Sequence, residues 1–292
     1  MAGGKTAPAF VPIGTASRSA QPPAMAVASR WRGLAYFGVV LCSYFLFLVI
    51  TLPAYWADRL SNRASLGAVR IQEPEGTLWN GSGNLVIRSA GQERMQTRIA
   101  WELQTLWLFA GKLQARFGAR NGGPALNATI RAGYHHLSIQ DVDATLPLSI
   151  LSAFIPAMDL VAPSGRLQIT AKQAILTPAG LDGDIQLTWL DAGTRMGGLS
   201  EAGDYRLVIN GRGATAGLSI ETLRGDIGIT GQGEWQAQNE GLLRLTGNIT
   251  PGSREQALRP LLTMMNARNN NGQYSWAFNG RFPLARILWA TP

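Results

Sequence analysis

The sequence predicts a mainly β protein: a single N-terminal transmembrane helix, then an antiparallel β-sheet domain with one or two short helices. Three observations lead to this prediction. A long uncharged segment lies near the N-terminus, short segments of alternating apolar and polar residues fill the rest of the chain, and turn residues separate these segments. The 34 Gly and 15 Pro follow no triplet period, which excludes a collagen-like chain and suits short elements joined by tight turns.

The uncharged segment GLAYFGVVLCSYFLFLVITLPAYW covers residues 33–56. A helix needs about 20 apolar residues to cross the hydrocarbon layer, so we expect this segment to be a transmembrane helix. Tyr36 and Trp56 lie near its two ends, where aromatic rings prefer the headgroup region. The preceding residues carry basic and no acidic side chains, namely Lys5, Arg18, Arg30 and Arg32. By the positive-inside rule, the N-terminus should be cytoplasmic and the chain after the segment should lie across the membrane.

A cleaved signal peptide is the alternative, with Ala54 to Ala57 as the cleavage region. The apolar core of a signal peptide is usually about 7 to 15 residues long and ends in an Ala-x-Ala motif, so we expect an uncleaved anchor. Residues 1–32 are rich in Ala, Pro, Ser and Gly, and we expect a disordered tail there. Cys42, the single cysteine, lies inside the anchor, so the remaining chain should fold without disulfides.

The net charge of +8 raises the question of nucleic-acid binding. The four basic residues of the tail account for half of it. The other arginines are dispersed and form no stripe of the kind that follows a phosphate backbone. We therefore expect no nucleic-acid partner and a solvated surface of mixed charge.

Residues 57–292 should form the β-rich domain, with a division into two halves considered near residue 160. Segments such as NLVIR and RLVIN approach an alternation of period two, which is typical of a sheet with one buried face. Asn-Gly pairs at 80–81, 210–211 and 279–280, and Asn-Gly-Gly at 121–123, predict tight hairpin turns. A sandwich, an open barrel and an elongated meander all fit. Two Pro-containing segments, 146–158 and 253–268, predict short helices.

A search for chemistry identifies no catalytic, cofactor-binding or metal-binding residue, and we expect a protein that is not an enzyme. Ser82 lies in Gly-Ser-Gly, which lacks the spacing and the strand-to-helix context of a nucleophile elbow. His135 and His136 are adjacent in an expected strand, so their side chains should point to opposite faces and cannot share a metal ion. The aspartate pairs 141/143 and 182/184 belong to no complete loop motif and are expected on solvated strand faces.

The stretch GTLWNGSG, which begins at Gly76, reads as a hairpin. Thr77, Leu78 and Trp79 should form a short strand with a large apolar anchor, and Asn80 with Gly81 the tight turn. The residues of this structural motif are Gly76, Thr77, Leu78, Trp79 and Gly81.

This stretch, after a single anchor that ends in Leu-Pro-Ala, resembles the signature of the protein N family of the bacterial type II secretion system. GLDGDIQLTWLDA at 180–192 resembles the second half of that family. The resemblance covers about residues 30–292, whereas residues 1–32 exceed the usual tail. It implies a single-pass inner-membrane protein with a cytoplasmic N-terminus and a β-rich periplasmic region. It also implies an accessory, non-enzymatic role in exporting folded proteins, with the inner-membrane platform and the secretin as partners.

An alternative comes from another class, the anchored envelope-biogenesis proteins with an apolar β-groove that binds or moves lipid. An apolar sheet face that stays open to solvent would favour this alternative. No cofactor and no small-molecule ligand other than a lipid are expected.

Overall fold

The computed structural model describes residues 25–89, 92–104, 111–119, 125–153, 162–194, 199–238 and 240–284. The chain divides into two compact units, with the boundary between Ile50 and Thr51. In the first unit, α1 covers Met25–Ile50, so this helix begins and ends earlier than the expected segment 33–56. Within the described residues, no helix combines the length and the apolar character of a membrane span. Most of the expected tail, residues 1–24, lies outside the described residues.

The second unit starts with a short helix that the sequence did not predict, α2 at Tyr55–Ala64, which contains Trp56. This helix packs against the first strand of the sheet. Asp58 joins the two elements, because its Oδ1 accepts a hydrogen bond of 2.8 Å from the backbone N–H of Ile71 and its Oδ2 lies 3.9 Å from Arg70.

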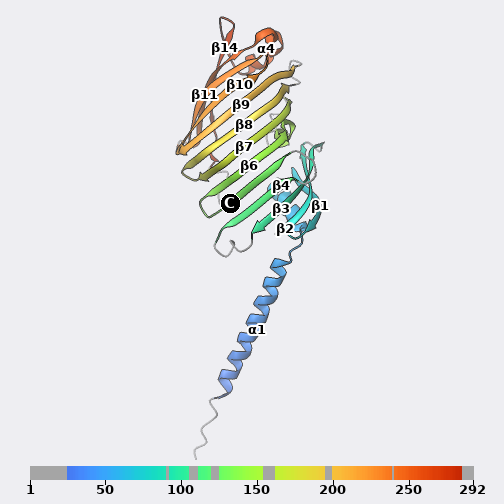
Figure 1. Ribbon diagram of the computed structural model, residues 1–292. Helices are drawn as coiled ribbons and strands as arrows, with labels where there is room; N and C mark the ends of the chain where they lie inside the picture. Colours follow the sequence, from blue (N-terminus) through green and yellow to red (C-terminus); the bar gives the residue numbers. More distant parts are fainter. Residues whose placement is uncertain are drawn as a thin grey trace, which may run out of the picture. The chain divides into compact units, whose positions relative to one another are not determined.

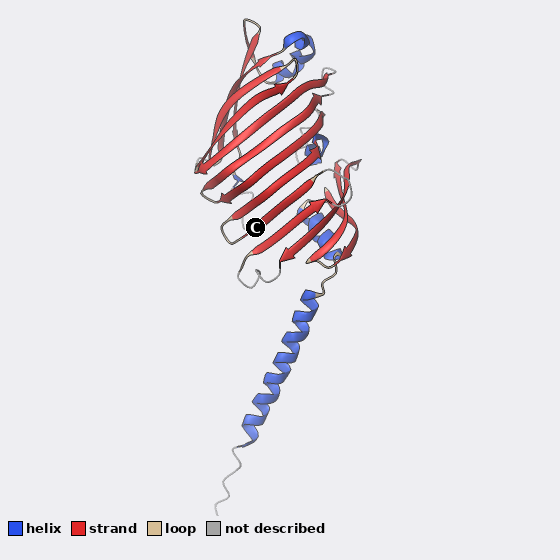
Figure 2. Ribbon diagram, viewed as in Figure 1, coloured by secondary structure: helices blue, strands red, loops and turns tan. Residues whose placement is uncertain are grey.

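The second unit is built on one antiparallel sheet of 14 strands, in the order β1 to β12, then β14 and β13 (Figures 1 and 2). The mainly β prediction is therefore confirmed. The sheet does not close, and of the three arrangements considered it is the meander. The strands are β1 Val69–Gly76, β2 Asn80–Ser89, β3 Gln92–Gln104, β4 Leu113–Ala119, β5 Leu126–Ala132, β6 Leu137–Pro147, β7 Pro163–Thr177, β8 Gly180–Thr194, β9 Leu199–Gly213, β10 Thr215–Arg224, β11 Gly228–Gln236, β12 Leu242–Thr250, β13 Arg268–Asn270 and β14 Gln273–Arg281.

Pairing aligns the alternation of every strand, so the sheet has two chemically distinct faces. Directly opposite residues in an antiparallel pair point to the same face. Between β8 and β9, Ile185 faces Ile209 and Leu187 faces Leu207 on one side, whereas Asp184 faces Asn210 on the other. We call the first side the apolar face. It continues through Leu167, Ile169, Leu218, Ile220, Leu243, Leu245, Trp276 and Phe278. The opposite side is the polar face.

Short helices cover parts of the apolar face, in line with the one or two short helices predicted. The 3-10 helix η2 (Leu148–Ala153) places Ile150 against Ile87 and Met95. Helix α4 (Glu255–Met264), which contains Pro260, follows the 3-10 turn η4 (Gly252–Arg254). From α4, Leu258 and Leu262 pack in one buried cluster with Trp276.

The division considered near residue 160 corresponds to no break in the sheet. Residue 160 itself lies outside the described residues. The strands on either side of it, β6 and β7, pair directly from Leu137 with Leu176 to Pro147 with Arg166. The sheet therefore continues from one half of the sequence into the other.

The predicted Asn-Gly turns at three positions are wrong, because these pairs lie inside strands. Asn80-Gly81 belongs to β2, Asn210-Gly211 to β9 and Asn279-Gly280 to β14. The fourth position, 121–123, lies outside the described residues. A two-residue turn of this type is formed instead by Asn271-Gly272, with φ values of 55° and 82°, between β13 and β14. Both positive φ values fit a type I′ turn.

Packing across strands explains why glycine occupies these interior positions. A Cβ atom on Gly81 would lie 2.6 Å from the Trp101 ring of β3, and one on Gly211 would lie 2.7 Å from the Leu181 side chain of β8. The missing side chain thus makes room for a large neighbour on the adjacent strand. The turns could not be located from the dipeptide alone.

Candidate functional site

The motif GTLWNG forms the turn between β1 and β2, which we call the GTLW turn (residues 76–81). Gly76 pairs with Gly81, so the turn consists of residues 77–80 and starts three residues before the expected Asn80-Gly81 turn. The expected short strand from Thr77 to Trp79 is therefore wrong, because these residues form the turn itself. Within it, the Thr77 N–H donates to the Asn80 carbonyl at 2.9 Å, and the Asn80 N–H donates to Thr77 Oγ1 at 3.0 Å. These hydrogen bonds satisfy the backbone of a turn that Thr77 closes with its own side chain.

The geometry of the turn requires glycine at both Gly76 and Gly81. Gly76 has φ of +88°, which glycine adopts without steric cost, and a Cβ there would meet the Asn80 carbonyl at 2.6 Å. Gly81 is buried, and the Trp101 ring occupies the space beside it. A side chain at either position would therefore disturb the turn.

The GTLW turn also holds the segment that follows α1 in the chain. Pro53 forms a bridge with Thr77, the Ala54 N–H donates to the Gly76 carbonyl at 3.1 Å, and the Leu78 N–H donates to the Leu52 carbonyl at 2.8 Å. Ala54 is only 1 % exposed. Residues 52–54 are thus part of the sheet domain rather than a free connection.

A side-chain hydrogen bond from strand β3 also holds the turn. The Trp101 indole N–H on β3 donates to the Leu78 carbonyl at 3.0 Å. Trp101 is 4 % exposed and packs in one cluster with Ala54, Ile71 and Ile99. Leu78 and Trp79 are half-buried. Sequence reasoning missed this role of Trp101, since nothing local connects it to a turn 23 residues earlier.

Other tryptophans make the same kind of bond. Trp189 on β8 donates its indole N–H to the Ser164 carbonyl at 2.9 Å, and Trp235 on β11 donates to the Phe282 carbonyl at 3.1 Å. The buried indole N–H of Trp276 has no hydrogen-bond partner. Its ring lies over Gly247 on the adjacent strand β12 and over Gly231 on the next strand, β11. Trp107 and Trp289 lie outside the described residues.

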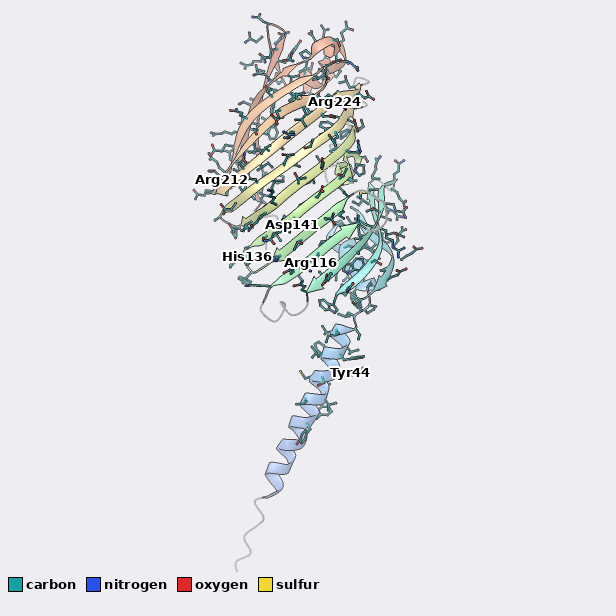
Figure 3. All side chains as sticks on the ribbon, viewed as in Figure 1. Tyr44, Arg116, His136, Asp141, Arg212 and Arg224 are labelled. Carbon is teal, nitrogen blue, oxygen red and sulfur yellow. The ribbon has the colours of Figure 1, made fainter. Side chains whose placement is uncertain are left out.

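Opposite charges are paired across strands of the polar face. Arg206 contacts Glu221 at 3.0 Å, and Arg224 contacts both Asp204 at 3.1 Å and Asp191 at 3.5 Å. Figure 3 labels Arg224 near the upper end of the sheet in that view. These pairs leave a surface of mixed sign, without a continuous basic stripe on the described strands.

The residues considered as metal ligands have other surroundings. Asp182 Oδ1 accepts a hydrogen bond from the Gly213 N–H at 2.8 Å, and Asp184 lies 3.5 Å from Arg212. His135 and His136 are exposed in the connection between β5 and β6, so their expected place in a strand is wrong. In the described part of the chain, no three His, Cys, Asp or Glu side chains form a group that could hold a metal ion.

A hollow of about 990 Å³ lies over strands β10, β11, β12 and β14. Much of its lining consists of hydroxyl and amide side chains, with Glu221 and Arg268 as charged members. The uncharged polar residues are Ser219, Thr230, Gln232, Thr246, Asn248, Asn266 and Ser275. Such a lining can form hydrogen bonds with a partner, but Glu221 is already paired with Arg206.

Tyr205 on β9 is a buried titratable group whose surroundings shift its pKa. Its hydroxyl donates to the Ile227 carbonyl at 3.1 Å. Burial, with a smaller contribution from the charge of Asp204, raises the pKa of Tyr205 to about 12. The hydroxyl is therefore protonated at neutral pH and acts as a structural donor.

The fold and these contacts define a class of protein: a one-sheet antiparallel domain whose first hairpin carries a Gly-Thr-Leu-Trp turn. The chain belongs to the type II secretion system protein N family, whose family model matches residues 67–277. The resemblance inferred from the GTLW motif is thus confirmed. No curated protein and no solved structure matches the chain. The matched region runs from just before β1 into β14, so membership rests on the sheet domain.

Membership establishes that the protein is involved in type II secretion, a process of protein transport in the cell envelope. It also makes the protein a component of secretion machinery, which interacts with other such components.

Proposed function

We propose that this protein is a non-enzymatic inner-membrane accessory component of the type II secretion machinery that supports export of folded periplasmic proteins through the outer membrane. In this proposal the part of the segment 33–56 that precedes Leu52 is a single-pass anchor, the N-terminus is cytoplasmic and the sheet domain, which includes residues 52–56, is periplasmic. The absence of charge between Gly33 and Trp56 supports the anchor. From Tyr36 to Phe47, large apolar side chains are exposed, which is unfavourable in water.

The observation that carries the proposal is the attachment of residues 52–54 to the GTLW turn. Two backbone hydrogen bonds, which together form the bridge between Pro53 and Thr77, join this segment to the turn, and Ala54 is buried. The sheet domain therefore starts within a few residues of the apolar segment. A rigid sheet held close to the membrane surface can position partners of the machinery, for which we propose the inner-membrane platform and the periplasmic part of the secretin.

The test is a deletion strain in which a secreted hydrolase is measured in the culture supernatant and in the periplasm. A periplasmic marker controls for leakage. We expect the hydrolase to accumulate in the periplasm of intact cells and the wild-type gene to restore secretion. Normal secretion in the deletion strain would refute the proposal.

Two complementing variants make this test specific for the GTLW turn. Gly81→Val places a side chain against the Trp101 ring, whereas a Cβ on Gly217 of β10 meets no atom within 4 Å. We expect Gly217→Val to restore secretion and Gly81→Val to fail. Equal secretion by both variants at equal protein levels would contradict a role of the turn.

The apolar face supports a second candidate function, the binding of lipid acyl chains. Ile185, Leu187, Leu207 and Ile209 are half-buried in the middle of the sheet, and Phe278 is 50 % exposed. In a water-soluble sheet the apolar face is normally covered by another layer. The described helices α2, α4 and η2 cover only parts of this face, through the clusters of Trp101, of Trp276 and of Ile87.

Neighbouring residues on opposite faces provide matched variants for this candidate. Leu187→Asp adds a charge to the apolar face, and Gln186→Asp adds the same charge to the polar face. Phospholipid bound to the purified full chain can be counted by mass spectrometry. Lipid that is lost with Leu187→Asp and kept with Gln186→Asp would support acyl-chain binding, whereas a wild-type chain that purifies without lipid would exclude it.

A further inference from the structure

The outer edge of β14 is only partly paired. Along its length β14 pairs with β12, but on the other side β13 covers only Gln273, Tyr274 and Ser275. On the side away from β12, the remaining residues of β14, 276–281, have no strand beside them among the described residues.

The turn geometry determines which main-chain groups point outward at this edge. In a two-residue hairpin the residues that close the turn, here Asn270 and Gln273, form a hydrogen-bonded pair, and the direction of the backbone groups then alternates along the strand. Ala277, Asn279 and Arg281 therefore direct N–H and C=O groups away from β12. The Phe282 N–H fits this alternation, since it donates inward to the Gly241 carbonyl at 2.7 Å.

The unpaired stretch is bounded at both ends. At one end, β13 begins opposite Ser275. At the other end the chain turns away after Arg281, because the Phe282 carbonyl accepts hydrogen bonds from the Trp235 indole at 3.1 Å and from the Leu284 N–H at 2.9 Å. Only a strand of about five residues fits between these limits, at about 3.4 Å per residue.

The two edges of the sheet differ in their protection. At the β1 edge, a bulge at Glu73 with φ of +49° is followed by Pro74, and Thr77 is already bridged to Pro53. Bulges and prolines are common means of preventing strand addition. Residues 277–281 contain no proline and no lysine, and no positive φ of a non-glycine residue occurs there. Among the described residues, the β14 edge thus carries none of these protections against pairing.

We propose that residues 277–281 of β14 form an interface between two copies of this chain, by antiparallel pairing of the two β14 strands around Asn279. This arrangement places Phe278 opposite Gly280 of the second copy and Ala277 opposite Arg281. The paired residues fill the unpaired stretch 277–281 without overlap, because each chain leaves the sheet after Arg281, where β13 of the other copy begins. The inference does not depend on the proposed function.

Packing and charge favour a second copy as the occupant. The Phe278 ring lies over Gly280 of its own strand, since a Cβ on Gly280 would be 2.7 Å from it, so the two Phe278 rings of a pair would lie side by side on the apolar face. The proposed pairing places Phe278 opposite a glycine, and the sheet already contains such pairs, since Gly81 lies opposite Trp101 and Gly247 opposite Trp276. Arg281 lies 2.6 Å from Glu240 of its own chain and would face Ala277, so like charges are not opposed.

The first experiment measures the mass of the purified full chain in detergent, with the detergent contribution subtracted, over a dilution series. We expect a dimer for the wild type and a monomer for Asn279→Pro. Proline removes an outward N–H that β12 does not use, and edge strands tolerate proline in such positions. The variant should therefore keep the wild-type circular dichroism spectrum and melting temperature. If it fails to fold, Ala277→Lys replaces it, with the same expected loss of the dimer.

The second experiment uses crosslinking in cells treated with a membrane-permeant thiol oxidant, so that it works in any compartment, in a Cys42→Ser background that removes the single native cysteine. Cα atoms of a hydrogen-bonded antiparallel pair lie about 5.5 Å apart, within the range that a disulfide spans. Asn279→Cys should thus give a disulfide-linked dimer, while Ser219→Cys, at an exposed interior position of β10, should not. A monomeric wild type, a dimeric Asn279→Pro, equal crosslinking at both positions or a crosslink of Asn279→Cys to another protein would each overturn the proposal.

Discussion

The Trp101 indole N–H donates a hydrogen bond of 3.0 Å to the Leu78 carbonyl, although 23 residues separate them. This bond connects β3 to the GTLW turn, and the same turn holds residues 52–54. A family motif that resembles a loop signature is thus a point where three segments of the chain meet.

Replacement of this tryptophan should be more harmful than replacement of another buried one. Trp101→Phe leaves the Leu78 carbonyl without its partner, and we expect a loss of stability of about 1 to 3 kcal/mol. Trp276→Phe is the matched control, because the buried Trp276 N–H has no partner to lose. Urea unfolding of the full chain, followed by circular dichroism, measures both. Equal losses for the two variants would contradict a role of the hydrogen bond.

Addition of one methyl group at Gly81 should destabilise the hairpin. Gly81→Ala places a Cβ 2.6 Å from the Trp101 ring and 2.8 Å from two backbone carbonyls, so we expect a cost of about 1 to 3 kcal/mol. Gly217→Ala should be neutral or slightly stabilising, because the site is open and alanine restricts the unfolded chain. Thermal melting of the two variants side by side provides the comparison, and a stable Gly81→Ala protein would show that the turn can adjust.

Stability should fall at high pH because of Tyr205. Its pKa in the folded chain is about 12, against about 10 when unfolded, so the folded state holds the proton more tightly. The stabilisation is complete below pH 10 and is lost as the pH rises through about 12, with an upper limit of about 3 kcal/mol. Urea midpoints at several pH values should show this fall for the wild type and for Tyr134→Phe, an 86 % exposed control. The fall should be smaller in Tyr205→Phe, where Tyr274 remains, whose pKa is raised mainly by its hydrogen bond to Glu255. An unchanged fall in Tyr205→Phe would assign it to another group.

The contact of α2 with the sheet should depend on the Asp58 side-chain oxygen. Asp58→Asn keeps an acceptor for the Ile71 N–H, whereas Asp58→Ala removes it. We expect Asp58→Ala to be less stable than Asp58→Asn by about 1 kcal/mol. Hydrogen exchange of the Ile71 amide gives a local measure, since it should be faster in Asp58→Ala alone. Equal exchange in both variants would mean that the ion pair with Arg70 holds the helix.

The alternation of residue types predicted the fold class because it is a local property. In RLVIN and GDIQLTW, apolar residues recur at every second position, and a strand must then bury one side. The two Pro-containing helices were found for the same reason, since Pro147 and Pro260 mark them within a few residues. The GTLW motif, read in its context, was sufficient to identify the family.

Strand register and the positions of the turns depended on contacts between distant residues. Gly81 lies inside β2 because Trp101 fills the space beside it, and Gly211 lies inside β9 because of Leu181. Asn-Gly favours a turn in an isolated peptide, but in this sheet the strand register decides. A shift of the register by one residue would expose the apolar side chains, so the strand continues through the Asn-Gly pair. The sequence by itself therefore determined a two-faced antiparallel sheet of this family. Tertiary packing alone decided where its hairpins turn, which segment the GTLW turn holds and which strand edge has no neighbour among the described residues.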